Sequence, residues 1–374
     1  MEKLGVGILG ATGAAGLEFV RALDGHPWFE IEELYASEKN AGKTLEEACS
    51  LDTSDISEYV RNKTLRNTRD ITGEQDLICS ALPPEVAKDI EENCAKHTPV
   101  ISTTSAFRYE NDVPILITEV NAGHYKLLKQ QKRRGWRGWI APGPNCTTVG
   151  LAMSLHPIYK ELGVKTVTMS SYQAVSGGGY ALIQKLEEQR KSDLKPLSVE
   201  EPIENPQVIL DRNVIGYIPD EEAKVKKETL KILGKYTTNG IEPAKFRIDC
   251  SCVRVPTLAG HFETVFIETE KSCSEADIKQ IYAEFNAECK EKFGNLPSSP
   301  RKTVVVLDRS PQPFLDAGLY GGMAVTVGRI EGSDAYDNGI KYQVLSNNTQ
   351  KGAAKGIVQV AEYLRKVGIL EPKK

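Results

Sequence analysis

Hydrophobic and polar positions follow two different periods along the first 145 residues. The run "LGVGIL" at 4–9 is continuously apolar, as in a buried strand, and the glycine turn "GATGAAG" follows it. Behind the turn, apolar residues recur at helical spacing at Leu17, Val20 and Leu23. Four further strand-like runs lie at 31–37, 76–83, 98–103 and 138–145, interspersed with helical stretches such as "PEVAKDIEENCAKH". This alternation predicts a Rossmann-type, doubly wound parallel sheet.

The pattern changes after Cys146. A helix is predicted directly behind it, because apolar residues recur at spacings of four, three and four at Leu151, Leu155, Ile158 and Leu162. Six β-rich runs follow, with helical segments at 220–234 and 274–291. These predict an α+β domain with a mixed, largely antiparallel sheet covered by helices on one face. We therefore expect a discontinuous cofactor domain (1–145 and 348–374) and a catalytic and dimerisation domain (146–347).

The composition narrows the class of protein. A chain of 374 residues exceeds what one hydrophobic core usually organises, which agrees with two domains. A net charge of −4 and a pI near 5.9 argue against a nucleic-acid or membrane-surface partner. The apolar runs are shorter than the ~20 residues that span a bilayer, and no signal-peptide cleavage region is present, so we expect a cytoplasmic protein. Eight cysteines without framework spacing predict neither a disulfide scaffold nor a metal site.

The glycine turn predicts a dinucleotide site. It lies between a strand and a helix, where glycines let the backbone approach a pyrophosphate, and it contains Gly7, Gly10, Gly13 and Gly16. The second predicted strand ends in "ASEKNAGK", with Glu38 as its only acid beside Ser37, Lys39 and Lys43. A hydroxyl and ammonium groups suit a 2′-phosphate, so NADP is predicted rather than NAD.

Cys146, in "GPNCTT", is the candidate nucleophile. At a helix N-terminus, free N–H groups and the positive end of the dipole are expected to lower its pKa from ~8.5 and to stabilise an oxyanion. Thioester chemistry coupled to hydride transfer also needs a base. His261, in "PTLAGHFE" between two predicted strands, is the candidate. The other histidines, at 26, 97, 124 and 156, are predicted in or beside helices on exposed stretches.

Several motifs in one order resemble the aspartate-semialdehyde dehydrogenase family nearly end to end. They are "GILGATGAAG", "GPNCTT", "YQAVSGGGY", "EEAKVKKETLKIL", "RVPTLAGH", "GMAVTVGRI" and "SNNTQKGAAKG". The resemblance implies NADP-dependent reduction of 4-phospho-L-aspartate to L-aspartate 4-semialdehyde with release of phosphate, and the reverse oxidation, through a cysteine thioester. It also implies a homodimer or homotetramer formed through the open face of the second sheet.

The resemblance assigns roles residue by residue. It implies that Cys146 is the nucleophile, His261 the general acid/base and Gln173 the residue that orients the substrate. The implied substrate contacts are Arg254 for the α-carboxylate, Glu221 for the ammonium, and Lys224 and Arg108, in "STTSAFR", for the phosphate. The implied cofactor contacts are Gly10, Ala11, Thr12, Gly13, Ala14, Ala15, Ser37, Lys39, Ser80, Ala81, Gly177 and Asn348.

The sequence departs from the family pattern at four positions. Asparagine is usual where Thr103 stands and histidine is frequent at Phe107, whereas histidine and arginine are common at Asn347 and Lys351. The basic stretch "KLLKQQKRRGWRGW", expected to be helical, resembles the archaeal and fungal branch and the related malonyl-CoA reductases.

Three other functions stay open on the sequence. They are a malonyl-CoA or related acyl-CoA reductase with the same cysteine and histidine, an N-acetyl-glutamyl-phosphate reductase, and a catalytically silent NADP-binding regulator.

Overall fold

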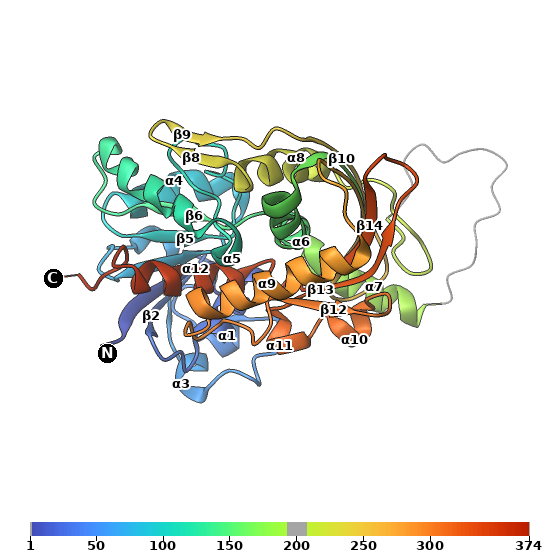
Figure 1. The fold of residues 1–374 in the computed structure, drawn as a ribbon. Helices are drawn as coiled ribbons and strands as arrows, with labels where there is room; N and C mark the ends of the chain where they lie inside the picture. Colours follow the sequence, from blue (N-terminus) through green and yellow to red (C-terminus); the bar gives the residue numbers. More distant parts are fainter. Residues whose placement is uncertain (1, 193–207, 374) are drawn as a thin grey trace.

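The computed structural model describes residues 2–192 and 208–373 and shows two sheets with helices packed on them (Figure 1). The first sheet contains β1 (Leu4–Leu9), β2 (Phe29–Ala36), β3 (Leu65–Asn67), β4 (Leu77–Ser80), β5 (Val100–Ser102) and β6 (Ile140–Pro142). Its order is β3-β2-β1-β4-β5-β6 and every pairing is parallel. The predicted doubly wound sheet is therefore confirmed, and only the three-residue strand β3 was not predicted.

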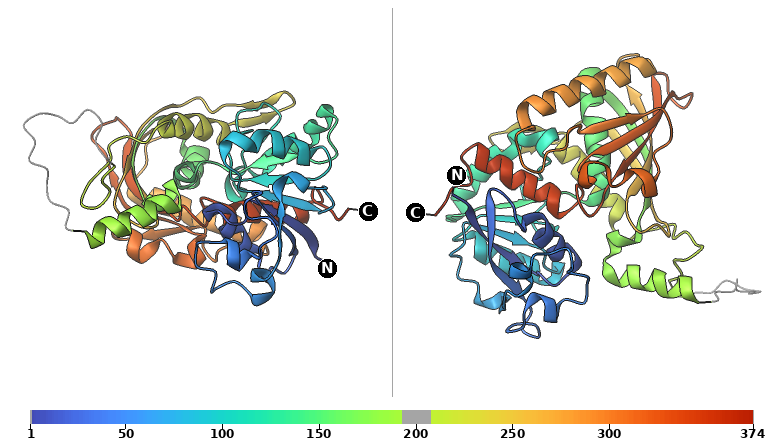
Figure 2. Two further views of the ribbon diagram at one scale, coloured as in Figure 1. Left: turned by 180° about the vertical axis from the view of Figure 1, so that it is seen from behind. Right: turned by 90° about the horizontal axis from the view of Figure 1, so that it is seen from below.

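Helix α12 packs against α1, which brings the two ends of the chain together (Figure 2). The helices of this half are α1 (Ala14–Leu23), α2 (Leu45–Ala48), α3 (Glu58–Arg61), α4 (Pro84–Ala95), α5 (Thr118–Asn121) and α12 (Ala354–Lys366), with short η1 (Thr68–Asp70). The basic stretch expected to be an α-helix is instead the 3₁₀ helix η2 (Ala122–Arg134), which ends at Gly135 with φ of 78°. A positive φ there favours glycine and ends the helix.

The second sheet is mixed, as predicted. It contains β7 (Val164–Gln173), β10 (Arg247–Arg254), β11 (His261–Thr269), β12 (Val304–Leu307), β13 (Val325–Gly332) and β14 (Gly339–Ser346), in the order β10-β7-β11-β14-β13-β12. The three central pairings are antiparallel and the two edge pairings, β10–β7 and β12–β13, are parallel.

Three long helices pack on one face of this sheet, α6 (Cys146–Leu162), α8 (Glu221–Ile232) and α9 (Glu275–Phe293). The smaller elements of this half are η3 (Val175–Gly178), α7 (Tyr180–Lys191), β8 (Lys235–Thr237), β9 (Gly240–Glu242), α10 (Pro313–Asp316) and α11 (Leu319–Gly322). Among the described residues, no helix is long and apolar enough to cross a bilayer.

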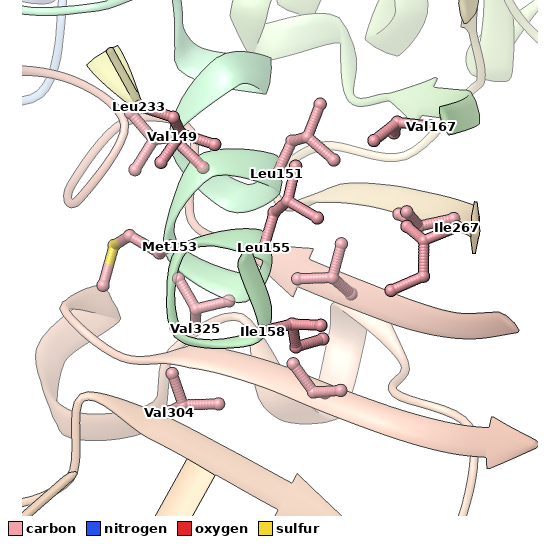
Figure 3. Packing of buried hydrophobic residues seen from close by; sticks show 14 of the residues in the cluster. Val149, Leu151, Met153, Leu155, Ile158, Val167, Leu233, Ile267, Val304 and Val325 are labelled. Atoms are coloured by element: carbon pink, nitrogen blue, oxygen red, sulfur yellow. The ribbon is translucent and has the colours of Figure 1, made fainter. Parts of the chain in front are cut away.

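Helix α6 lies in the centre of the second core, with apolar side chains from several strands around it (Figure 3). Its buried residues include Val149, Leu151, Met153, Leu155 and Ile158, which cover more than one face of the helix. A helix buried in this way cannot shift without opening a cavity. The first residue of α6 is Cys146, so the core holds the sulfur in a fixed place.

The opposite face of the second sheet exposes aromatic side chains. Tyr172 of β7 pairs with Phe262 of β11, and Phe266 lies on the same face four residues further along β11. Tyr172 is 39% exposed and Phe266 is 36% exposed. Exposed aromatic groups on a sheet face are typical of a surface that binds another protein.

Candidate active site

A cavity of about 640 Å³ lies where the glycine turn, the start of α6 and the start of α8 meet. Segments from both sheets line it. Of the residues singled out in the sequence, the lining includes Ala14, Ala15, Arg108, Cys146, Gln173, Gly177, Glu221, Lys224, Arg254 and Asn348. Residues from opposite ends of the chain, such as Ala14 and Asn348, thus meet around one space.

The strand order explains why three of these side chains meet. Gln173 ends β7 and Arg254 ends the parallel strand β10, directly opposite it. His261 begins the antiparallel strand β11, so its N-terminal end lies at the same edge of the sheet. The Arg254 guanidinium donates through Nη1 to the carbonyl oxygen of Ala174 at 2.8 Å and to Gln173 Oε1 at 3.5 Å.

Cys146 and His261 are in direct contact. The Cys146 Sγ lies 3.2 Å from His261 Nε2, although 115 residues separate them in the sequence. The Ala174 N–H donates to His261 Nδ1 at 3.2 Å. Because Nδ1 accepts this bond, the neutral ring carries its proton on Nε2, where it faces the sulfur.

Burial favours the neutral form of both side chains. Burial raises the pKa of the Cys146 thiol to about 12, and the charge of Glu221 adds to this, while Arg254 and Arg108 act in the opposite direction. Burial, together with the charge of Arg254, lowers the pKa of His261 to about 3. The predicted lowering of the cysteine pKa is therefore wrong, because desolvation of the sulfur outweighs the helix N-terminus.

Asn145 fixes the start of α6. Its Oδ1 accepts hydrogen bonds from the N–H groups of Thr147 and Thr148 at 3.0 and 3.2 Å, an N-cap that satisfies two free donors. Its Nδ2 donates to Glu221 Oε1 at 2.9 Å, and the Thr147 hydroxyl donates to the same oxygen at 3.2 Å. Helix α8 thus contacts the turn that contains the sulfur.

Arg108 is held from three sides. Its Nε donates to the Gly143 carbonyl at 2.8 Å, Nη1 to Glu228 Oε1 at 3.0 Å, and Nη2 to the Thr103 carbonyl at 2.9 Å. Thr103 contributes only a backbone oxygen to this contact, which any residue type can offer. Phe107 is buried in an apolar cluster.

The glycine turn has the shape of a phosphate cradle. Gly10 has φ of 75°, and a Cβ there would lie 2.6 Å from the Ala81 carbonyl oxygen. A Cβ at Gly16 would lie 2.0 Å from the carbonyl oxygen of Gly10. These close approaches exclude side chains and leave the turn and the N-terminus of α1 open to a pyrophosphate, so the residues present fit a dinucleotide.

Some of the other predicted cofactor contacts lie in the cavity lining, and others lie outside it. Ala11, Thr12 and Gly13 complete the turn between β1 and α1, while Ser37 and Lys39 follow β2 as exposed residues outside the cavity lining. Ser80 is fully buried at the end of β4, next to Ala81. Asn348 accepts from the Gly260 N–H at 2.9 Å and donates to Ser176 Oγ at 2.8 Å.

The last two departures from the family pattern have structural partners. Asn347 accepts from the N–H groups of Thr349 and Gln350, both at 3.0 Å, and so forms the turn before α12. The Lys351 Nζ lies 2.6 Å from Glu119 Oε2, and both side chains are buried.

Two histidines expected on exposed stretches are buried, which corrects that prediction. His26 contacts Glu362 through Nε2 at 3.1 Å, and His124 contacts the Gly234 carbonyl at 3.1 Å. These two partners come from segments more than 100 residues away, so the local sequence did not indicate that the rings are buried. Within residues 2–192 and 208–373, no group of three His, Cys, Asp or Glu side chains could hold a metal ion.

Two buried acids were not anticipated. Glu228 contacts Arg108, and the available signal was its position seven residues after Glu221, on the same side of α8. Glu263, two residues after His261, has no hydrogen-bond partner for its carboxyl oxygens among the described residues, and burial raises its pKa well above the usual range. Burial thus favours the protonated form of Glu263, and Gly150 leaves room for its side chain, since a Cβ there would lie 2.9 Å from Oε1.

Comparisons with known proteins agree with this geometry. Residues 5–128 match the semialdehyde dehydrogenase NAD binding domain, and residues 155–351 match the semialdehyde dehydrogenase dimerisation domain. The chain is 39% identical to an aspartate-semialdehyde dehydrogenase of Methanothermobacter thermautotrophicus, over 97% of this chain and 99% of that one. It is 32% identical to a malonyl CoA reductase (NADP) of Metallosphaera sedula, over 99% of both chains. The structure of aspartate semialdehyde dehydrogenase with NADP from Candida albicans superposes with a TM-score of 0.83, at 30% identity over 98% of this chain and 100% of that one.

Proposed function

This chain belongs to the aspartate-semialdehyde dehydrogenase family, and we propose that it interconverts 4-phospho-L-aspartate and L-aspartate 4-semialdehyde with NADP as the cofactor. The observation that carries the proposal is the contact of 3.2 Å between Cys146 Sγ and His261 Nε2 at the wall of a cavity lined by charged groups. A thiol and an imidazole in contact beside a dinucleotide cradle support acyl transfer coupled to hydride transfer.

The charges of the cavity complement the substrate. Arg254 is proposed to bind the α-carboxylate, since a guanidinium binds a carboxylate through two parallel hydrogen bonds. Glu221 would accept the α-ammonium, and Lys224 and Arg108 would bind the phosphate. Gln173 lies beside Arg254 and would hold the reacting carbonyl near the sulfur.

Acyl transfer proceeds without an external base. The Cys146 sulfur attacks the acyl carbon, the bond from that carbon to the phosphate oxygen breaks, and the leaving phosphate takes up the proton of the thiol. Positive charge from Arg108 and Lys224 would favour departure of the phosphate. Proton uptake by phosphate suits a thiol that is protonated before substrate binds.

His261 is proposed to act through the proton on Nε2. NADP, in its reduced form, supplies the hydride, and the turn from Gly10 to Ala15 is proposed to hold its pyrophosphate, with Ser37, Lys39, Ser80, Ala81, Gly177 and Asn348 along the remainder. As the thioester is reduced, the Nε2–H would hydrogen-bond the oxyanion while the ring stays neutral, and as the carbon–sulfur bond breaks the departing Cys146 thiolate would take up one proton from solvent. The sequence implied that His261 acts as both acid and base. The geometry supports only hydrogen-bond donation from Nε2, because Nδ1 already accepts the Ala174 N–H.

The match to a dimerisation domain supports an oligomer. We further propose a homodimer, or a homotetramer built from it, formed through the sheet face that exposes Tyr172 and Phe266. The packing of α12 on α1 supports a cofactor domain made of 1–145 and 348–374, with 146–347 as the catalytic and dimerisation domain. Inorganic phosphate is the proposed second substrate of the oxidation, and a cytoplasmic location stays a prediction from the sequence.

A phosphate-dependent NADP reduction assay with L-aspartate 4-semialdehyde tests this function. We expect turnover by the wild-type protein and none by Cys146→Ala, which should still bind NADPH. The relative from Metallosphaera sedula makes malonyl-CoA reduction the second candidate, so malonyl-CoA should be assayed in parallel. Turnover with malonyl-CoA alone would establish that function instead, and NADPH binding without either turnover would indicate a regulator.

A further inference from the structure

Glu228 of α8 joins two parts of the active site through one carboxylate. Its side chain is fully buried. Oε1 accepts from Arg108 Nη1 at 3.0 Å, and Oε2 accepts from the backbone N–H of Asn145 at 2.6 Å. A buried carboxylate with both oxygens engaged by donors is strongly held, because loss of either partner would leave a polar group unsatisfied.

The first contact orients the arginine. The two other bonds of the Arg108 guanidinium go to the neutral carbonyl oxygens of Gly143 and Thr103. Glu228 is the only acid that the described part of the chain places within ion-pair distance of Arg108. With three donors fixed, the remaining N–H groups of Arg108 are left for the cavity that it lines.

The second contact fixes the nucleophile turn. Asn145 directly precedes Cys146, and its side chain caps α6. Binding of the Asn145 N–H by Glu228 therefore holds the backbone at the sulfur, while Glu221 holds the Asn145 side chain. Helix α8 contributes both carboxylates, seven residues apart.

We propose that Glu228 is a positioning residue that sets the phosphate-binding Arg108 in register with Cys146. This inference rests on the proposed function. In an acyl phosphate the carbon attacked by sulfur and the phosphate are joined through a single oxygen. The cation and the sulfur must therefore keep a fixed separation, and misplacement by a fraction of an ångström lowers the rate.

The variant Glu228→Gln tests whether Glu228 fixes the position of Arg108 relative to Cys146. Its side-chain amide has one acceptor oxygen, whereas three donors face this side chain: Arg108, the Asn145 N–H and the Tyr109 hydroxyl, which lies 3.4 Å from Oε1. One donor must lose its partner, and we expect KM for phosphate to rise about tenfold to a hundredfold, with a fall in kcat. KM for the semialdehyde and for NADP should change less than about threefold, because Arg254 and the glycine turn are held elsewhere.

Glu222→Gln is the matched control. It removes the same charge from the same helix, but the Glu222 carboxylate accepts from the Cys252 N–H at 3.2 Å and does not contact Arg108. We expect its KM for phosphate to stay at the wild-type value. Glu228→Asp keeps the charge and shortens the side chain by one methylene group, so its KM for phosphate should be intermediate.

The outcomes separate this inference from the proposed function. An unchanged KM for phosphate in Glu228→Gln, an equal rise of all three KM values, or the same effect in Glu222→Gln would overturn the positioning role. If Glu228→Gln fails to fold, the test is made with Glu228→Asp. A wild-type KM for phosphate in Glu228→Asp would then also overturn the positioning role. Absence of phosphate-dependent turnover in the wild-type protein would instead contradict the proposed function.

Discussion

Replacing Gly177 by alanine adds a methyl group beside Arg254 and His261, which we propose to bind and activate the substrate. A Cβ at this position would lie 2.9 Å from Arg254 Nη1, 2.9 Å from His261 Cε1 and 3.0 Å from His261 Nε2. Ordinary contacts of a Cβ begin at 3.4 Å, so one partner or the loop must move by 3.4 − 2.9, or 0.5 Å. Neither side chain moves freely, because the backbone of Ala174 binds both.

The displacement predicts a loss of catalysis. A misplacement of about 1 Å can lower a rate about 100-fold, so half of that displacement at two groups predicts a fall in kcat/KM of about tenfold to a hundredfold. This range corresponds to about 1.4 to 2.7 kcal/mol of transition-state stabilisation. The same close contacts should also lower the melting temperature, because an overpacked position costs about 1 to 3 kcal/mol of stability.

The assay is the initial rate of NADP reduction with semialdehyde and phosphate, beside a fluorescence titration with NADPH. The titration is needed because Gly177 is also a proposed cofactor contact. Gly178→Ala is the control, since its Cβ would meet the half-buried Leu182 side chain, which can rotate away. Wild-type kcat/KM in Gly177→Ala, or an equal loss in Gly178→Ala, would refute the reasoning.

The remaining predictions concern charge and protonation. In the unliganded protein, alkylation of Cys146 by iodoacetamide, measured against Cys146→Ala, should keep accelerating above pH 9, because burial raises the thiol pKa to about 12; a plateau near pH 8.5 would contradict this. Glu221→Gln should accelerate this alkylation at fixed pH by removing a negative charge, while turnover of the semialdehyde is lost; unchanged alkylation would contradict the effect of the charge. Burial lowers the pKa of His124 from 6.5 to about 4, so its contribution to stability is complete above pH 6.5 and is lost as the pH falls toward 4. Between pH 6.5 and 4 this loss amounts to about 3 kcal/mol of unfolding free energy. The urea midpoint of His124→Gln should therefore fall less over this pH range than that of the wild type, and parallel curves would count against the prediction. Lys351→Met should lower stability by about 3 to 5 kcal/mol because it leaves Glu119 buried without its cation, and adding Glu119→Gln should restore part of the loss in a thermal melt. A melting temperature unchanged by Lys351→Met would contradict it.

The sequence predicted the features that depend on neighbours in the chain. Apolar runs alternating with helical spacing predicted the doubly wound parallel sheet, and the glycine turn marked the cradle at Gly10. The three-residue strand β3 was missed because so short a run has no period to detect. The stretch 122–134 has helical spacing, but the structure makes it a 3₁₀ helix.

The sequence also supplied the residue types of the site, because motifs for Cys146, Gln173 and His261 are local. It did not supply their partners. Glu228 contacts Asn145 from 83 positions away, and Glu263 faces Gly150 from another element, so neither partner could be identified from the residues next to the acid in the chain.

The pKa of Cys146 is the clearest case in which the sequence alone gave a wrong prediction. From the sequence alone, its position at a helix N-terminus predicted a low pKa, since the free N–H groups belong to the next few residues. Tertiary structure reversed the sign, because α6 is enclosed by strands from distant parts of the chain and Glu221 lies nearby. Periodicity and capping follow from covalent neighbours, whereas desolvation and Coulomb energy depend on every atom within several ångströms, whichever segment it comes from.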